Sequence, residues 1–306
     1  MRYLKRLLIL GILLPAFLFA SSIQKTTKTF AVKDSQELKM DIYTADSTFS
    51  SLQPCLIFVF GGGFKEGKRD EPAYQSYFDY FTKKGFIVVS IDYRLGMKGQ
   101  KVPGVFNTKP LENAISLAVE DLFSATKYLL ENAEELNIDK KCMIISGSSA
   151  GAITVLQSEY ELKNHHSLAS ELPDDFSYAG VISFAGGIFS TEGLPSYTVP
   201  PAPTLFFHGS ADKLVPYKET RFFNKGMFGS KSLTSNFYKK NYPYLFYSME
   251  GLGHEVASFP MKEFLPEIEQ FIKNFVFEKK LWMVEVYFTD QQRKSEINIT
   301  PSNYYK

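Results

Sequence analysis

The chain has 306 residues, of which 44% are hydrophobic and 22% are charged, and these values are typical of one large globular domain rather than of a disordered chain. Its formal net charge is +1 at pH 7. Residues 1–20 contain three cationic side chains and no acidic one, so their removal would leave a net charge of −2. Because a nearly neutral protein has little attraction for polyphosphates, a nucleic-acid partner is excluded.

The first twenty residues have the pattern of an export signal. Arg2, Lys5 and Arg6 precede an uncharged apolar run, Leu7–Ala20. A helix over that run rises only about 21 Å, whereas a membrane span needs about 30 Å. We therefore expect residues 1–20 to be a signal peptide, cleaved near its end, which implies a secreted or periplasmic mature chain with no stable membrane span. An uncleaved membrane anchor is the alternative.

Beyond the signal, short apolar runs alternate with helical patterns. Such alternation predicts a mostly parallel sheet with helices on both faces, here as one domain over residues 21–280. Residues 281–306 are expected to form a C-terminal extension, in which Trp282–Phe288 could add an edge strand. The expected strands are 29–32, 38–43, 56–60, 86–93, 143–146, 181–184, 204–207 and 244–248, and the expected helices are 74–84, 115–129, 150–161 and 261–277.

Two connections are longer and more polar than ordinary loops. They are Gly96–Pro110 and Gly187–Pro203, and both contain glycine and proline. Long loops in a compact domain are usually functional, so both are candidate lids.

The chain has two cysteines, Cys55 and Cys142, and each begins an apolar run. We expect two buried small hydrophobic side chains, although a disulfide stays open for an exported protein. These cysteines and four scattered histidines are too few for a metal site, so no metal is expected.

The sequence Gly-Ser-Ser-Ala-Gly at residues 147–151 has the pattern of a nucleophile turn. In the G-x-S-x-G motif the serine sits on a sharp strand-to-helix turn, and the small flanking residues let the backbone pass closely. An apolar strand precedes this motif and a helical pattern follows it, as the motif requires. We therefore predict that Ser149 is a catalytic nucleophile.

The partners of such a serine follow in the order acid, then histidine. Asp212 and His254 each come shortly after an expected strand, so they should meet Ser149 at the carboxyl edge of the sheet. His254 would accept the serine proton, and Asp212 would hold the imidazole in the right tautomer. His208 and Glu255 are interpreted as a structural residue and a loop charge.

Acyl transfer also needs hydrogen-bond donors for an oxyanion. The triplet Gly61–Gly63 follows the strand 56–60, and glycines let backbone N–H groups face a developing negative charge. We predict that the N–H groups of Gly62, Gly63 and Ala150 form the oxyanion hole. Phe64, Phe184 and Tyr217 are expected near the edge of the site.

Six segments of the sequence resemble the esterase/lipase branch of the α/β-hydrolase superfamily, and secreted bacterial carboxylesterases in particular. In order along the chain they are LKMDIY, FVFGGGF, VVSIDYRL, GSSAG, HGSADKLVP and GLGH. The resemblance covers residues 38–277 and implies an eight-stranded α/β-hydrolase sheet and no cofactor. It also implies an ester substrate, either a small molecule or an acylated carbohydrate. The family often has histidine where Phe60 stands and an acidic or other polar residue where Ser148 stands.

The leading prediction is a serine-dependent carboxylic ester hydrolase that acts through an acyl-enzyme. A peptidase like the prolyl oligopeptidases, or another acyl transferase, is the enzymatic alternative, although no segment here could supply their usual partner domain. A catalytically inactive binding protein on the same fold is the third interpretation, because a fold alone does not prove activity. The sequence leaves the oligomeric state open.

Overall fold

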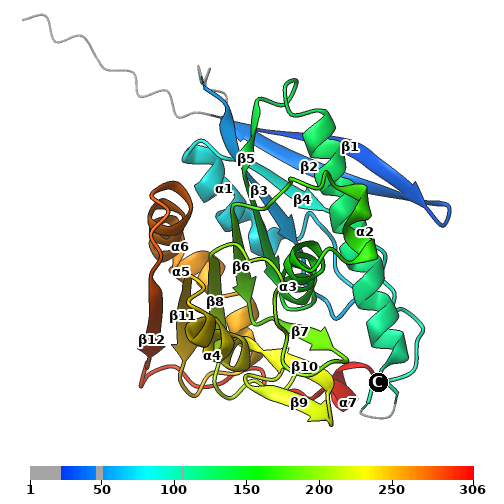
Figure 1. The fold of residues 1–306 in the computed structure, drawn as a ribbon, viewed down its shortest axis with the longest axis vertical. Coiled ribbons are helices and arrows are strands. Elements are labelled where there is room, and N and C mark those ends of the chain that lie inside the picture. The colour runs from blue at the N-terminus through cyan, green and yellow to red at the C-terminus, as the bar shows by residue number, and fades with distance from the viewer. Residues whose placement is uncertain (1–21, 46–50, 105–106) are drawn as a thin grey trace, which may run out of the picture.

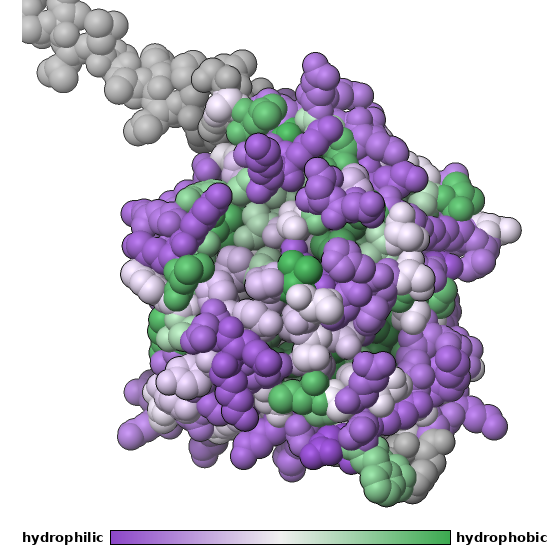
Figure 2. All heavy atoms as spheres, in the orientation of Figure 1, coloured by the Kyte–Doolittle hydropathy of each residue, from purple (hydrophilic) through white to green (hydrophobic). Residues whose placement is uncertain are grey.

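The computed structural model describes residues 22–45, 51–104 and 107–306 (Figure 1). The predicted signal peptide at residues 1–20 lies outside these ranges and stays a prediction. Among the described residues, no helix is both long enough and apolar enough to cross a membrane. The face seen in Figure 2 is mainly hydrophilic, and its hydrophobic side chains lie in small scattered groups.

A twisted nine-stranded sheet runs through the molecule in the order β1-β2-β4-β3-β5-β6-β8-β11-β12. The β1–β2 and β2–β4 pairs are antiparallel, and every pair from β4 to β12 is parallel. The eight strands that the resemblance implied are therefore one too few, and the possible edge strand in the C-terminal extension forms as β12, Met283–Phe288. The other strands are β1 (Ile23–Lys33), β2 (Gln36–Ala45), β3 (Gln53–Val59), β4 (Ile87–Ile91), β5 (Ile138–Ser148), β6 (Gly180–Phe184), β8 (Thr204–Gly209) and β11 (Tyr244–Met249).

Helices cover both faces of this sheet, with α2, α3 and α4 on one face and α1, α5 and α6 on the other (Figure 1). The expected helix over 261–277 is instead divided, because Pro266 lies in a first helical turn, the position at which its missing N–H costs nothing. The helices are α1 (Gln75–Lys83), α2 (Lys109–Glu131), α3 (Ala150–Lys163), α4 (Ser230–Lys240), α5 (Pro260–Glu263), α6 (Leu265–Phe271), a π-helical turn (Ile272–Phe277) and α7 (Pro301–Tyr304), with short 3-10 turns at η1 (Pro72–Tyr74), η2 (Ser167–Glu171) and η3 (His254–Ala257).

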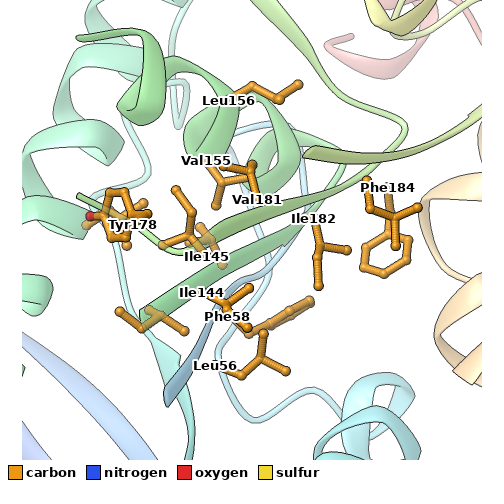
Figure 3. Close-up of a cluster of buried hydrophobic side chains, with 14 of the residues drawn as sticks. Leu56, Phe58, Ile144, Ile145, Val155, Leu156, Tyr178, Val181, Ile182 and Phe184 are labelled. Atoms are coloured by element: carbon orange, nitrogen blue, oxygen red, sulfur yellow. The ribbon is translucent and has the colours of Figure 1, made fainter. Parts of the chain in front are cut away.

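The central strands are buried on both faces, which explains their unbroken apolar runs. Figure 3 shows Ile145 and Val181 on the side of α3, and Ile144 and Ile182 on the opposite side. All four side chains are fully buried. Successive residues of a strand point to opposite faces, so each central strand contributes to two hydrophobic layers.

A second, three-stranded antiparallel sheet has the order β7-β10-β9, with β7 at Gly187–Ser190, β9 at Glu219–Phe222 and β10 at Lys225–Gly229. The sequence did not predict it, because all four residues of β9 are exposed and show no apolar alternation. Residues 187–190, the start of the second candidate lid, therefore form a strand rather than a loop.

The two cysteines are free thiols. Cys55 is buried on β3, and Cys142 is half-buried on β5. Burial raises the pKa of Cys142 to about 11 and raises the pKa of Cys55 as well. Both side chains therefore behave as small hydrophobic groups, as the sequence indicated.

Glu159 on α3 is a buried carboxyl. Its Oε1 accepts a hydrogen bond from the Ala202 N–H at 2.7 Å, but its Oε2 has no partner among the described residues. Burial raises the pKa of Glu159 from 4.5 to about 7, although Lys163 acts in the opposite direction. The folded state therefore holds this proton more tightly than the unfolded chain. It loses stability as the pH rises from about 4.5 through about 7.

The variant Glu159→Gln cannot ionise and should lose this pH dependence. Between pH 4.5 and pH 8 we expect the free energy of unfolding of the wild type to fall by about 3 kcal/mol relative to that of the variant. Urea unfolding of both proteins at several pH values measures this difference. If the free energy of unfolding changed equally with pH in the two proteins, Glu159 would not be the group that causes this pH dependence.

Candidate active site

Ser149 occupies a sharp turn between β5 and α3. Its backbone has φ 52° and ψ −114°, a strained conformation for a residue with a side chain. A Cβ on Gly147 would lie 2.2 Å from the carbonyl oxygen of Gly151, and a Cβ on Gly151 would lie 2.0 Å from that of Val59. Both flanking positions therefore require glycine, and the strain holds Ser149 out at the end of the strand.

The structure brings the three predicted side chains into one hydrogen-bonded chain. Ser149 Oγ lies 2.8 Å from His254 Nε2, and His254 Nδ1 lies 2.7 Å from Asp212 Oδ2. Asp212 follows β8 and His254 begins η3 after β11, so both reach Ser149 from the carboxyl ends of parallel strands. His254 and Asp212 are both buried.

The electrostatics of Asp212 fix the tautomer of His254. Burial works to raise the pKa of Asp212, but contacts with His208 and His254 outweigh it and hold that pKa well below its usual range. The ionised carboxylate can only accept hydrogen bonds, so His254 Nδ1 carries the ring hydrogen. Nε2 is then free to accept the proton of Ser149.

His208 has a role that the sequence did not indicate. Its Nε2 lies 3.2 Å from the Val215 carbonyl oxygen and 3.5 Å from Asp212 Oδ2, and its Nδ1 lies 2.8 Å from Ser230 Oγ. A carbonyl oxygen only accepts, so Nε2 carries a hydrogen that also faces the carboxylate. His208 is therefore a structural residue, as predicted, and in addition it stabilises the charge of Asp212.

Two neighbours of the central residues hold the loops together. Ser148 Oγ donates to the Ala257 carbonyl oxygen at 2.8 Å, which ties the serine turn to η3. Glu255 is buried, and its carboxylate accepts the N–H groups of Gly253 at 2.7 Å and Ile297 at 3.0 Å. The interpretation of Glu255 as a loop charge was therefore wrong, since it fixes the turn that carries His254.

The predicted oxyanion loop packs against the serine turn. A Cβ on Gly61 would lie 3.3 Å from the Cβ of Ser149. Gly63 and Ala150 line the same cavity as Ser149, whereas Gly62 does not. Ala150 is the first residue of α3, so its N–H has no partner within the helix. Two of the three predicted donors thus line the cavity beside the serine, and the oxyanion-hole role of Gly62, Gly63 and Ala150 stays a prediction.

Phe60 replaces the family's histidine with an aromatic contact. Its ring stacks on Tyr93 with centroids 4.4 Å apart, and the Tyr93 hydroxyl donates to the Phe60 carbonyl oxygen at 3.2 Å. Phe60 and Tyr93 are both buried. This pair fixes the start of the glycine loop without a histidine.

Ser149 opens into a cavity of about 380 Å³ with a mainly apolar lining. Of the three aromatic residues expected at the edge of the site, Phe64 lines it. Phe184 lies in the core instead, and the hydroxyl of Tyr217 lies 2.6 Å from Ser248 Oγ, outside the lining. The candidate lid 96–110 contributes residues 103, 104 and 108, and the other candidate lid contributes Phe189. The described residues contain no cluster of histidine, cysteine and carboxylate side chains that could hold a metal ion.

The sheet is mostly parallel, and the serine turn follows β5, the acid follows β8 and the histidine follows β11. This arrangement defines an α/β-hydrolase fold. Solved structures that are similar to this chain agree. Esterase 2 of Thermogutta terrifontis, phosphoramylated by tabun, superposes with a TM-score of 0.63 at 22% identity, covering 83% of this chain and 95% of that one. Its propionate-bound form gives 0.61 at 20% identity, with the same coverage of both chains.

The family model BD-FAE matches residues 40–188, from β2 through the serine turn to β7. Esterase B1 of Culex pipiens is 28% identical over 149 residues, which are 46% of this chain and 24% of that protein. Carboxylesterase 5A of Ovis aries is 34% identical over 122 residues, which are 39% of this chain and 29% of that protein. The chain thus spans only about a quarter of the length of these curated relatives. The chain therefore has the α/β-hydrolase fold, and both the family model and the curated relatives make it similar to the esterase branch of that superfamily.

Proposed function

We propose that this protein is a serine carboxylesterase that hydrolyses a carboxylic ester through an acyl-enzyme on Ser149. The observation that carries the proposal is the chain of two short hydrogen bonds, 2.8 Å from Ser149 Oγ to His254 Nε2 and 2.7 Å from His254 Nδ1 to Asp212 Oδ2, at the wall of an open cavity. The esterase relatives support the reaction class.

The reaction follows from these positions. As Ser149 Oγ attacks the ester carbonyl, its proton passes to His254 Nε2, and the imidazolium that forms faces the Asp212 carboxylate. The N–H groups of Gly63 and Ala150 would stabilise the oxyanion. The tetrahedral intermediate then collapses, the ester C–O bond breaks, and the alkoxide leaves with the proton from Nε2. A water molecule then attacks the acyl-enzyme carbonyl as His254 Nε2 takes its proton. The C–O bond to Ser149 breaks, the carboxylic acid leaves, and Nε2 returns the proton to Ser149 Oγ.

The cavity suits an ester that has a hydrocarbon part. The cavity lining is mainly apolar, which suits the hydrocarbon part of an ester. The acylated-carbohydrate substrate stays a prediction from the sequence resemblance.

A fluorophosphonate probe tests the proposed nucleophile directly. Incubation with the probe should add one label per chain, and digestion followed by mass spectrometry should place it on Ser149, because only an activated serine reacts rapidly. The same protein should release p-nitrophenol from p-nitrophenyl butyrate, and labelling should abolish the release. Heat-denatured protein is the control and should stay unlabelled. A label on another residue, or ester hydrolysis that survives complete labelling, would refute the proposal.

A further inference from the structure

The segment Ile297–Lys306, here called the strap, returns to the site from the far edge of the main sheet. In Figure 1 the red part of the chain leaves β12, runs along the lower end of the sheet and reaches α7 beside β9 and β10. The strap therefore crosses the carboxyl edge of the sheet, where the candidate catalytic residues lie.

At its start the strap is bonded to the turn that carries the histidine. The His254 N–H donates to the Ile297 carbonyl oxygen at 3.3 Å, and the Ile297 N–H donates to Glu255 Oε2 at 3.0 Å. A Cβ on Gly253 would lie 2.5 Å from the Ile297 carbonyl oxygen, so the two backbones are in close contact.

At its other end the strap is bonded to the oxyanion loop. The Tyr305 hydroxyl donates to the Gly63 carbonyl oxygen at 3.0 Å, and the Tyr304 hydroxyl donates to Glu66 Oε1 at 3.1 Å. The Tyr304 ring lies directly over Gly63, since a Cβ there would come within 2.3 Å of a ring carbon. The two tyrosine rings meet edge to face with centroids 5.1 Å apart.

Pro301, Ser302, Tyr304 and Tyr305 of the strap line the cavity that holds Ser149. Both tyrosines are only partly exposed, and each has its hydroxyl bonded to the protein. A ring fixed in this way presents a rigid apolar wall to whatever enters the cavity.

We propose that the strap completes the active site and that Tyr304 is its specificity-determining residue; this inference rests on the proposed function. The ring of Tyr304 limits the size of the ester group that lies on the Gly63 side of Ser149. Tyr305 is a positioning residue, because its hydrogen bond to the Gly63 carbonyl holds the oxyanion loop in place.

Two opposite substitutions test the wall. Tyr304→Ala should enlarge the cavity and raise the ratio of kcat/KM for large esters to kcat/KM for small esters about tenfold. Tyr304→Trp should lower that ratio. A pocket discriminates between substrates that differ slightly in size by roughly tenfold. The ratio is measured in two series, p-nitrophenyl esters from acetate to octanoate and acetate esters of alcohols of increasing size. Tyr238→Ala, at an exposed tyrosine on α4 outside the cavity lining, is the matched control and should keep the wild-type ratios.

A folding defect would lower all rates together, whereas the proposal requires the ratios to move in opposite directions in the two variants. Ratios unchanged in both series would overturn it. That failure would be distinct from failure of the proposed function, because fluorophosphonate labelling at Ser149 of the wild type is measured independently.

Tyr305→Phe tests the positioning role, since it removes only the hydroxyl. We expect kcat to fall about tenfold while KM stays within about twofold, because a displaced oxyanion loop weakens transition-state binding and leaves substrate binding intact. An unchanged kcat, or a rise in KM alone, would show that the hydrogen bond to Gly63 does not position the loop.

Discussion

Ser149→Ala is expected to lower kcat for p-nitrophenyl butyrate by about 10⁵- to 10⁶-fold, the scale of loss when a serine nucleophile is removed. The alanine side chain has no oxygen to form the acyl-enzyme, and His254 then has no hydroxyl proton to accept. Initial rates of p-nitrophenol release at saturating substrate give the ratio of the two kcat values. Enough enzyme is used for the catalysed rate to exceed the rate of spontaneous hydrolysis.

The matched control is Ser235→Ala, which makes the same chemical change on α4. The Ser235 hydroxyl donates to the Lys231 carbonyl oxygen of its own helix at 2.8 Å, so its loss should leave kcat within about twofold. A Ser149→Ala protein that retained more than about a hundredth of the wild-type kcat would require a different nucleophile. Thermal melting of both variants shows whether a lost rate reflects unfolding.

Asp212→Asn is expected to lower kcat by about 10⁴-fold because it reverses the tautomer of His254. Asp212 Oδ1 accepts the N–H groups of Leu214 at 2.9 Å and Val215 at 3.1 Å. An asparagine must therefore place its carbonyl oxygen there and its NH₂ group toward His254. That NH₂ group donates to Nδ1, so the ring hydrogen moves to Nε2, which can no longer accept the proton of Ser149.

The control for this variant is Asp139→Asn, an equal loss of charge at the amino end of β5, where the partly exposed side chain accepts the Lys141 N–H at 2.9 Å. It should keep the wild-type kcat, and KM should change little in either variant. If Asp212→Asn kept more than about a tenth of the wild-type kcat, the histidine would have to be oriented by another acid.

Much of the candidate site followed from local sequence. The motif at residues 147–151 could be recognised directly, because a Cβ on Gly147 would meet the Gly151 backbone of the same turn, although the close contact of Gly151 with the Val59 carbonyl oxygen joins distant segments. Asp212 and His254 could be placed because each follows an apolar strand, and parallel strands end at one edge of the sheet.

Other parts of the site could not be predicted, because they depend on contacts between distant segments. Glu255 looks like a solvent-exposed charge in the sequence, yet it is buried because Ile297 supplies an N–H partner. His208 and Asp212 are only four residues apart, but their contact depends on the fold of the turn after β8, which brings His208 Nε2 within 3.5 Å of the carboxylate.

The sequence by itself determined the α/β architecture, the serine turn and the order of the three central residues, since alternating apolar periods and steric limits at a turn act over a few residues. Only the tertiary structure decided that Tyr304 and Tyr305 cover Gly63, whereas the possible edge strand at the C-terminus was already visible in the sequence and forms as β12, Met283–Phe288. The contact between Gly63 and Tyr305 joins segments that are more than two hundred residues apart. No local pattern encodes such pairing, because its free energy comes from surfaces that exist only after the rest of the chain has folded.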